Sequence, residues 1–315
     1  MFWIVLLIIA TVFILISLIT SCYIFFRVFY SFRKEPEEFP VPKGAIYEPY
    51  HKQMIAWIKE VRAMEHLDVS IKSHDGLTLN GKYYEYKKGA PIEIMFHGYK
   101  GCGEQDLSGA VFRCFKIGHN ALIVDHRASG NSEGRVITFG AKECLDCLRW
   151  VDFAINNIDK DAKIMITGIS MGASTVMTAS SMGLPKNVVA VIADCGYTST
   201  KDIITKVMDD MKLPGKLLYP FARLGAILFG RFDPDKRSPI KSMEKCTLPI
   251  LFIHGDADDF VPCSMSIENY NTCISENKQL MIINGAGHGL CFLADNEKFY
   301  EGLNKFLDSV YGNDR

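Results

Sequence analysis

The chain has 315 residues, of which 48% are hydrophobic, and its 35 lysines and arginines nearly balance its 36 aspartates and glutamates. It is long enough to bury one large core, but it lacks the excess of basic residues typical of nucleic-acid-binding proteins. Its ten cysteines show no framework spacing, which favours a reducing compartment over a disulfide scaffold. The pair Cys144 and Cys147 has no second pair or histidine cluster with which to complete a zinc site, so no metal site is predicted.

Residues 1–26 contain no charged side chain. At about 1.5 Å per residue, a helix of this length crosses a hydrocarbon core of roughly 30 Å with some tilt. A cleaved signal peptide is the alternative, but no basic residue precedes the apolar run and no small-x-small site follows it. A lipoprotein signal ending at Cys22 is a further alternative, although apolar residues follow this cysteine instead of a polar tether. We expect a transmembrane anchor.

The charges that flank the apolar run predict its orientation. Arg27, Arg33 and Lys34 follow the run, whereas only the α-amine precedes it. The positive-inside rule therefore predicts a single-pass protein of the cell membrane whose body lies in the cytoplasm, although nearby glutamates weaken the bias.

Residues 27–64 form a juxtamembrane segment. Its first part, "RKEPEEFPVPKG", is charged and proline-rich, which is typical of a short, stiff linker. From Tyr47 to Met64, apolar side chains recur at helical spacing, which predicts an amphipathic helix that packs on the following domain.

Residues 65–315 alternate strand-like and helix-like segments. The later strand candidates are continuous apolar runs, as expected for parallel strands that are covered on both faces. Two leading antiparallel strands followed by repeated β-α units predict one α/β domain with a mostly parallel, doubly wound, eight-stranded sheet. The expected strands are 67–73, 77–86, 92–97, 120–126, 162–168, 187–194, 248–254 and 278–285, and the expected helices are 104–116, 140–157, 171–183, 264–275 and 295–311.

The interval between the strands at 187–194 and 248–254 is longer than one crossover helix requires. Within it, Leu217, Phe221, Leu224 and Leu228 lie along one face of a helix-like segment. We interpret residues 197–245 as an inserted helical cap over the carboxyl edge of the sheet, where open α/β sheets bind ligands. Ordinary peripheral packing is the alternative.

Two serines match the pattern G-x-S-x-G, Ser132 in "GNSEG" and Ser170 in "GISMG". A nucleophile elbow requires a strand that runs directly into the serine and a helix that begins directly after it. Ser170 meets this requirement, because "KIMITG" precedes it and "MGASTVMTASSM" follows it. Ser132 stands in a polar loop seven residues after the strand end at Asp125, so we expect it to shape a turn.

A serine hydroxyl becomes a strong nucleophile when a base removes its proton and an acid orients that base. In the elbow fold, the acid and the histidine follow the serine on the loops after later strands. His288, which follows "QLMIING", is the expected base. The residue pattern leaves four candidates for the acid: Asp194, Asp256, Asp258 and Asp259.

Three segments resemble α/β-hydrolase-fold serine hydrolases over roughly residues 65–312. "HGDADDFVP" resembles the family's H-G-x-x-D-x-x-V-P motif, whose aspartate is the triad acid, and this implies Asp258. "MFHGYKG" is similar to the H-G segment after the third strand, which implies that the backbone amides of Tyr99 and Met171 form the oxyanion hole. "DHRASGNSEG" resembles the D-x-R-x-x-G-x-S-x-G loop. Within this family, the chain most resembles the subgroup of prolyl-oligopeptidase-like and dienelactone-hydrolase-like enzymes that have a membrane anchor.

Together these features predict a serine hydrolase with Ser170 as nucleophile, His288 as base and Asp258 as orienting acid. The expected reaction is cleavage of carboxylic esters or thioesters, on apolar acyl or lipid-like substrates near the membrane. A peptidase or amidase acting on small peptides is the alternative enzyme. A non-catalytic binding protein of the same fold is the alternative of another class. No cofactor is implied.

Overall fold

One eight-stranded sheet forms the body of the molecule, in the computed structural model that describes residues 1–32 and 37–312. Arg33 and Lys34, which contribute to the predicted orientation, lie outside the described residues. The strand order is β1-β2-β4-β3-β5-β6-β7-β8; β1 and β2 are antiparallel to their neighbours and all other pairs are parallel. The strands are β1 Leu67–Lys72, β2 Thr78–Tyr84, β3 Ile92–Phe96, β4 Asn120–Val124, β5 Ile164–Ile169, β6 Val188–Asp194, β7 Ile250–Gly255 and β8 Lys278–Ile283.

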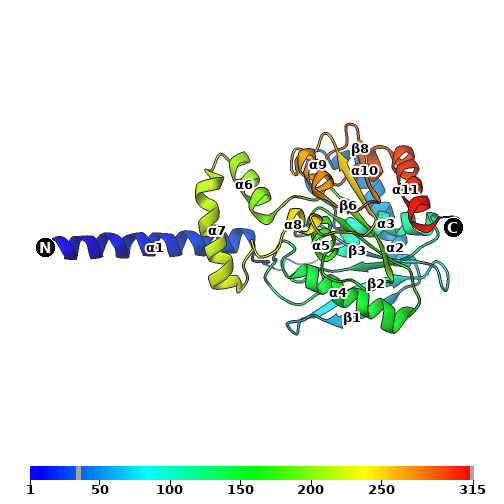
Figure 1. The fold of residues 1–315 in the computed structure, drawn as a ribbon, viewed down its shortest axis with the longest axis horizontal. Helices are drawn as coiled ribbons and strands as arrows, with labels where there is room; N and C mark the ends of the chain where they lie inside the picture. Colours follow the sequence, from blue (N-terminus) through cyan, green and yellow to red (C-terminus); the bar gives the residue numbers. More distant parts are fainter. Residues whose placement is uncertain (33–36, 313–315) are drawn as a thin grey trace.

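Helices cover both faces of this sheet, so the predicted doubly wound α/β architecture is confirmed (Figure 1). The helices α4, α5 and α8 pack on one face, and α2, α3, α10 and α11 pack on the other. The helices are α1 Phe2–Val28, α2 His51–Ala63, α3 Gly103–Lys116, α4 Glu143–Phe153, α5 Met171–Ala179, α6 Thr200–Asp210, α7 Gly215–Gly230, α8 Pro239–Met243, α9 Cys263–Thr272, α10 Cys291–Ala294 and α11 Asn296–Tyr311.

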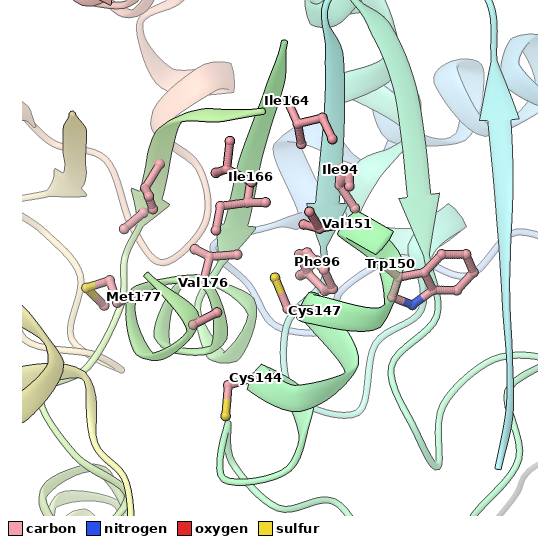
Figure 2. Close-up of a cluster of buried hydrophobic side chains, with 14 of the residues drawn as sticks. Ile94, Phe96, Cys144, Cys147, Trp150, Val151, Ile164, Ile166, Val176 and Met177 are labelled. Carbon is pink, nitrogen blue, oxygen red and sulfur yellow. The ribbon is translucent and has the colours of Figure 1, made fainter. Parts of the chain in front are cut away.

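The central strands are buried on both sides because their side chains alternate between two apolar layers. Ile94 and Phe96 of β3 point into the layer shared with α4 and α5, where Trp150 and Val176 also lie (Figure 2). Met95, between them in sequence, points to the opposite layer under α3. This alternation explains why four of the five residues of β3 are apolar; the fifth, Glu93, is also buried and forms an ion pair with Arg113.

Helix α1 has two parts with different surroundings. Nearly all of its side chains up to Ile19 are exposed, and it extends away from the body (Figure 1). Ser21, Ile24 and Phe25, in the last two turns, are buried. The chain that follows α1 is held to the body by backbone hydrogen bonds from Ser31 N to Arg135 O and from Ile137 N to Phe29 O. The end of α1 is therefore part of the folded core.

The interval 197–245 contains α6, α7 and α8, and α7 crosses α1 beside the body (Figure 1). Its buried face consists mainly of small residues together with Tyr219, and includes Ala222 and Ala226. The leucine face expected from the sequence is open at its two ends, since Leu217 is 67% exposed and Leu228 is 48% exposed, whereas Phe221 and Leu224 are partly buried. Small residues pack here because they allow two helix backbones to approach closely.

Candidate active site

Ser170 occupies a sharp turn between β5 and α5. Its backbone has φ 56° and ψ −114°, an uncommon conformation for a residue with a side chain. The turn is possible because glycines flank it: a Cβ at Gly168 would overlap the backbone of Gly172, and a Cβ at Gly172 would overlap the carbonyl oxygen of Phe96. The strand-turn-helix context predicted for Ser170 is thus present.

A chain of hydrogen bonds joins Ser170, His288 and Asp258. The Ser170 hydroxyl donates to Nε2 of His288 over 2.9 Å, and Nδ1–H of His288 donates to Oδ2 of Asp258 over 2.7 Å. The three side chains come from loops that follow β5, β8 and β7, at the carboxyl edge of the sheet. The structure therefore brings together all three side chains that the sequence singles out.

Asp258 is held as a carboxylate by donors around it. Oδ1 accepts hydrogen bonds from the backbone N–H groups of Phe260 and Val261, and Nε2 of buried His254 lies 3.1 Å from Oδ2. Burial alone would raise the pKa of Asp258, but the hydrogen bonds from His254 and His288 outweigh it and hold that pKa well below its usual range. Asp258 is therefore ionised at neutral pH and suited to orienting His288.

The other three candidate acids have different surroundings. Asp256 accepts a hydrogen bond from the backbone N–H of Gly285, and the backbone carbonyl of Asp259 accepts from Nζ of Lys206. Asp194 is partly buried at the end of β6, and desolvation raises its pKa to about 6 in spite of nearby His254 and His288. Of the four aspartates, Asp258 is the one hydrogen-bonded to His288.

Two loops lie where the sequence predicts oxyanion donors. Met171 is the first residue of α5, so its N–H has no acceptor within the helix. Gly98 approaches Ser170, and its own N–H donates to Asp106 over 2.9 Å, which fixes the loop that carries Tyr99. The Tyr99 hydroxyl in turn donates to the carbonyl oxygen of Val28, at the end of α1, over 2.6 Å. The sequence offered no signal for this last contact.

Ser132 has the structural role that we expected of it. Its hydroxyl donates to the carbonyl oxygen of Asp125 over 2.8 Å and accepts from the N–H of Asn80 over 2.8 Å, and the residue is fully buried. Through these two hydrogen bonds, Ser132 links the loop after β4 to strand β2. The second G-x-S-x-G match is thus a turn, as predicted.

A cavity of about 580 Å³ opens beside Ser170, within the range of small-molecule sites. Its lining is mostly apolar and includes Met95, Ile169 and Ile192 on the sheet, although Arg113 and Asp194 also contribute to it. Ile46 and Trp57, from the segment between α1 and β1, also line it. None of the described lining residues comes from the interval 197–245. The segment between α1 and β1, in which the sequence predicted only a linker and a packing helix, therefore supplies the wall that we expected from the inserted helices.

The thiol of Cys195 completes a compact group with Asp258 and His288, whose ligand atoms lie within 4.8 Å of one another. Such a group can in principle hold a metal ion. Both ring nitrogens of His288, however, already have hydrogen-bond partners, and burial raises the pKa of the Cys195 thiol well above its usual value. The hydrogen bonds of His288 to Ser170 and Asp258 therefore already use the two ring nitrogens that a metal ion would need.

A comparison with protein families agrees with this geometry. Residues 138–314, more than half of the chain, match the model of the prolyl oligopeptidase family. The chain belongs to the prolyl oligopeptidase family. The matched range of this family member contains Ser170, Asp258 and His288, whereas Tyr99 lies before it.

Two curated relatives of this prolyl oligopeptidase family member extend the comparison. The uncharacterized protein YqkD of Bacillus subtilis is 28% identical over 195 residues, which are 62% of this chain and 64% of that protein, so the match spans less than two thirds of the relative. Protein bem46 of Schizosaccharomyces pombe is 23% identical over 251 residues, covering 78% of this chain and 77% of that protein.

Solved structures show which fold this family member has. An esterase of Pyrococcus furiosus, Pf2001, superposes with a TM-score of 0.66 at 24% identity and covers 80% of this chain and 96% of that one. Est1E of Butyrivibrio proteoclasticus, solved with ferulic acid bound, gives a TM-score of 0.57 at 22% identity over 78% of this chain and all of that one. The protein has the α/β-hydrolase fold, as the sequence predicted, and belongs to a family of serine hydrolases.

Proposed function

We propose that the protein hydrolyses carboxylic esters with Ser170 as nucleophile, His288 as general base and Asp258 as the acid that orients it. The observation that supports this most directly is the continuous chain of hydrogen bonds through the three residues. The Nδ1–H tautomer, which Asp258 stabilises, leaves Nε2 free to accept the proton of the serine hydroxyl.

The chemistry follows from these positions. Ser170 Oγ attacks the ester carbonyl while its proton moves to Nε2 of His288, and the negative charge that develops on the carbonyl oxygen is stabilised by the N–H groups of Tyr99 and Met171. Ionised Asp258 stabilises the imidazolium that forms. His288 then donates the proton to the leaving alkoxide, which departs as an alcohol, and the acyl group remains on Ser170. Water, activated by His288 in the same way, releases the acid and restores the hydroxyl.

We assign esters, with thioesters as a second choice, because the cavity beside Ser170 has apolar walls that fit an acyl chain. Peptide or amide hydrolysis is the second candidate, and membership of the prolyl oligopeptidase family favours it. Hydrolysis of either bond proceeds through the same type of acyl-enzyme. A panel of p-nitrophenyl esters of graded chain length, assayed beside small peptide amides, therefore distinguishes the two activities by kcat/KM.

We further propose that α1 anchors the protein in a membrane. The helix has a mean hydropathy of 3.1 over its most apolar window and is long enough to cross a bilayer. A signal sequence passes the same test, but cleavage after the apolar run would remove Ile24 and Phe25 from the core. The body then faces the cytoplasm by the positive-inside rule, and the substrate is an amphiphilic acyl ester met at the bilayer.

A fluorophosphonate probe tests the nucleophile, because it labels only an activated serine. We expect the parent to be labelled and Ser170→Ala to lose both labelling and ester turnover. Ser132→Ala is the matched control: it should keep its labelling while losing about 1–3 kcal/mol of unfolding free energy, since it leaves the N–H of Asn80 unpaired. Unlabelled parent protein would favour the non-catalytic alternative, and equal labelling of Ser170→Ala would refute the assignment.

A further inference from the structure

Helix α7 carries a row of apolar side chains that no part of the described chain covers fully. Leu217, Phe221, Leu224 and Leu228 follow one another at intervals of four, three and four residues, so they share one face. Leu217 and Leu228 are 67% and 48% exposed, whereas Phe221 and Leu224 between them are partly buried. In the turn before α7, Met211 is 63% exposed and Leu213 is 43% exposed. Exposed apolar clusters of this kind mark interaction surfaces.

The contact between α7 and α1 shows which way this row faces. A side chain at Gly225 would overlap the carbonyl oxygen of Ser21, whereas one at Gly230 would meet the ring of Phe25, one helical turn further along α1. Phe221 and Leu228 are the i−4 and i+3 neighbours of Gly225. The leucine row therefore lies on the flank of α7 that faces the amino-terminal, exposed part of α1.

The length of that exposed part fixes the level at which α7 sits. Residues 2–20 of α1 span roughly 28 Å at about 1.5 Å per residue, close to the roughly 30 Å of a hydrocarbon core. If α1 crosses a bilayer, Ser21 lies near the plane where hydrocarbon gives way to headgroups. Because α7 contacts α1 at Ser21 and crosses it (Figure 1), α7 lies in that plane.

We propose that α7 is a second membrane-contacting element, an interfacial helix whose leucine row enters the acyl-chain boundary of the bilayer. Lys212, Lys216 and Arg231 are exposed around it and suit the phosphate groups of anionic lipids. The proposal rests on the membrane crossing of α1 proposed above. It commits to a lipid surface as the partner, not to a second copy of the chain.

The experiment adds one tryptophan reporter at a time to the full-length protein. Leu217→Trp and Leu228→Trp place the reporter on the row. Ile274→Trp is the matched control, because Ile274 is 55% exposed in the loop after α9, remote from α1. Each protein is reconstituted in phosphatidylcholine vesicles containing phosphatidylglycerol, with or without brominated acyl chains, which quench only indole rings that reach the hydrocarbon. A Trp3→Phe variant isolates the contribution of α1.

We expect the added emission at positions 217 and 228 to be mostly quenched by brominated lipid, and that at position 274 to be unaffected. Quenching of Trp3 together with unquenched reporters on α7 would overturn this proposal while leaving the anchor intact. Unquenched Trp3 would overturn the anchor and this proposal with it. Reporters on α7 that are shielded from a water-soluble quencher but unaffected by brominated lipid would point to a protein partner and also overturn it.

Discussion

Asp194 at the end of β6 and Asp258 in the loop after β7 lie at the same edge of the sheet, yet their pKa values are shifted in opposite directions. Hydrogen bonds from His254 and His288 keep the pKa of Asp258 low, whereas burial raises that of Asp194 to about 6. The residue pattern left both as candidates for the acid; the resemblance to a family motif favoured Asp258. Sequence could not decide from the residues alone because the choice depends on which carboxylate reaches Nδ1 of His288.

The two aspartates give a direct test of the assignment. Asp258→Asn should lower kcat by about 10⁴-fold with little change in KM, because an amide favours the wrong tautomer of His288. Asp194→Asn is the control and should retain kcat within a few-fold. The measurement is steady-state hydrolysis of one p-nitrophenyl ester by both variants, and a larger loss in Asp194→Asn would contradict the assignment.

Asp194 also predicts a pH dependence of stability. Its pKa is about 6 when folded, against about 3.9 when unfolded, so the native state binds the extra proton between these values. The contribution of Asp194 to the free energy of unfolding is therefore lost as pH rises from about 4 to about 6, and it amounts to at most about 3 kcal/mol. In denaturant titrations, Asp194→Asn should gain stability relative to the parent over this window, and a constant difference between the two would contradict the prediction.

Among the elements, the strands were the most predictable, because runs such as β4 and β7 are buried on both faces and are therefore almost entirely apolar. The helices around them were also found within a few residues. The packing partners of α7 and of the juxtamembrane segment were not predictable. The more apolar face of α7, which carries Leu217 and Leu228, is open at its two ends. The face of small residues packs on α1, because small side chains allow the two helix backbones to approach closely.

The contact between α1 and the Tyr99 loop predicts a measurable coupling between elements. Tyr99→Phe removes the hydrogen bond to Val28 but leaves the backbone N–H of Tyr99 in place. We expect a loss of about 1 kcal/mol in unfolding free energy and faster proteolysis between α1 and α2. Tyr86→Phe, at a half-exposed tyrosine, is the control and should change neither quantity. Equal proteolysis rates in the two variants would show that the bond does not hold α1 in place.

For the whole molecule, the decisive question is the side of the membrane on which the body lies. Cytoplasmic orientation predicts that trypsin added to intact cells leaves the body uncut, and that permeabilised cells yield soluble fragments. Digestion from outside intact cells would reverse the proposed topology. In the sequence, only a few charges beside the apolar run support this orientation. The rest of the chain carries no signal for it, because orientation depends on how the whole molecule inserts into the bilayer.

The firm attachment of α1 to the Tyr99 loop has a kinetic consequence. If α1 is anchored, these contacts hold Ser170 at a constant height above the lipid. Its encounters with an amphiphilic substrate then occur by lateral diffusion in two dimensions. The rate would depend on the mole fraction of substrate in the surface, and adding inert lipid at constant bulk substrate would slow the reaction by dilution.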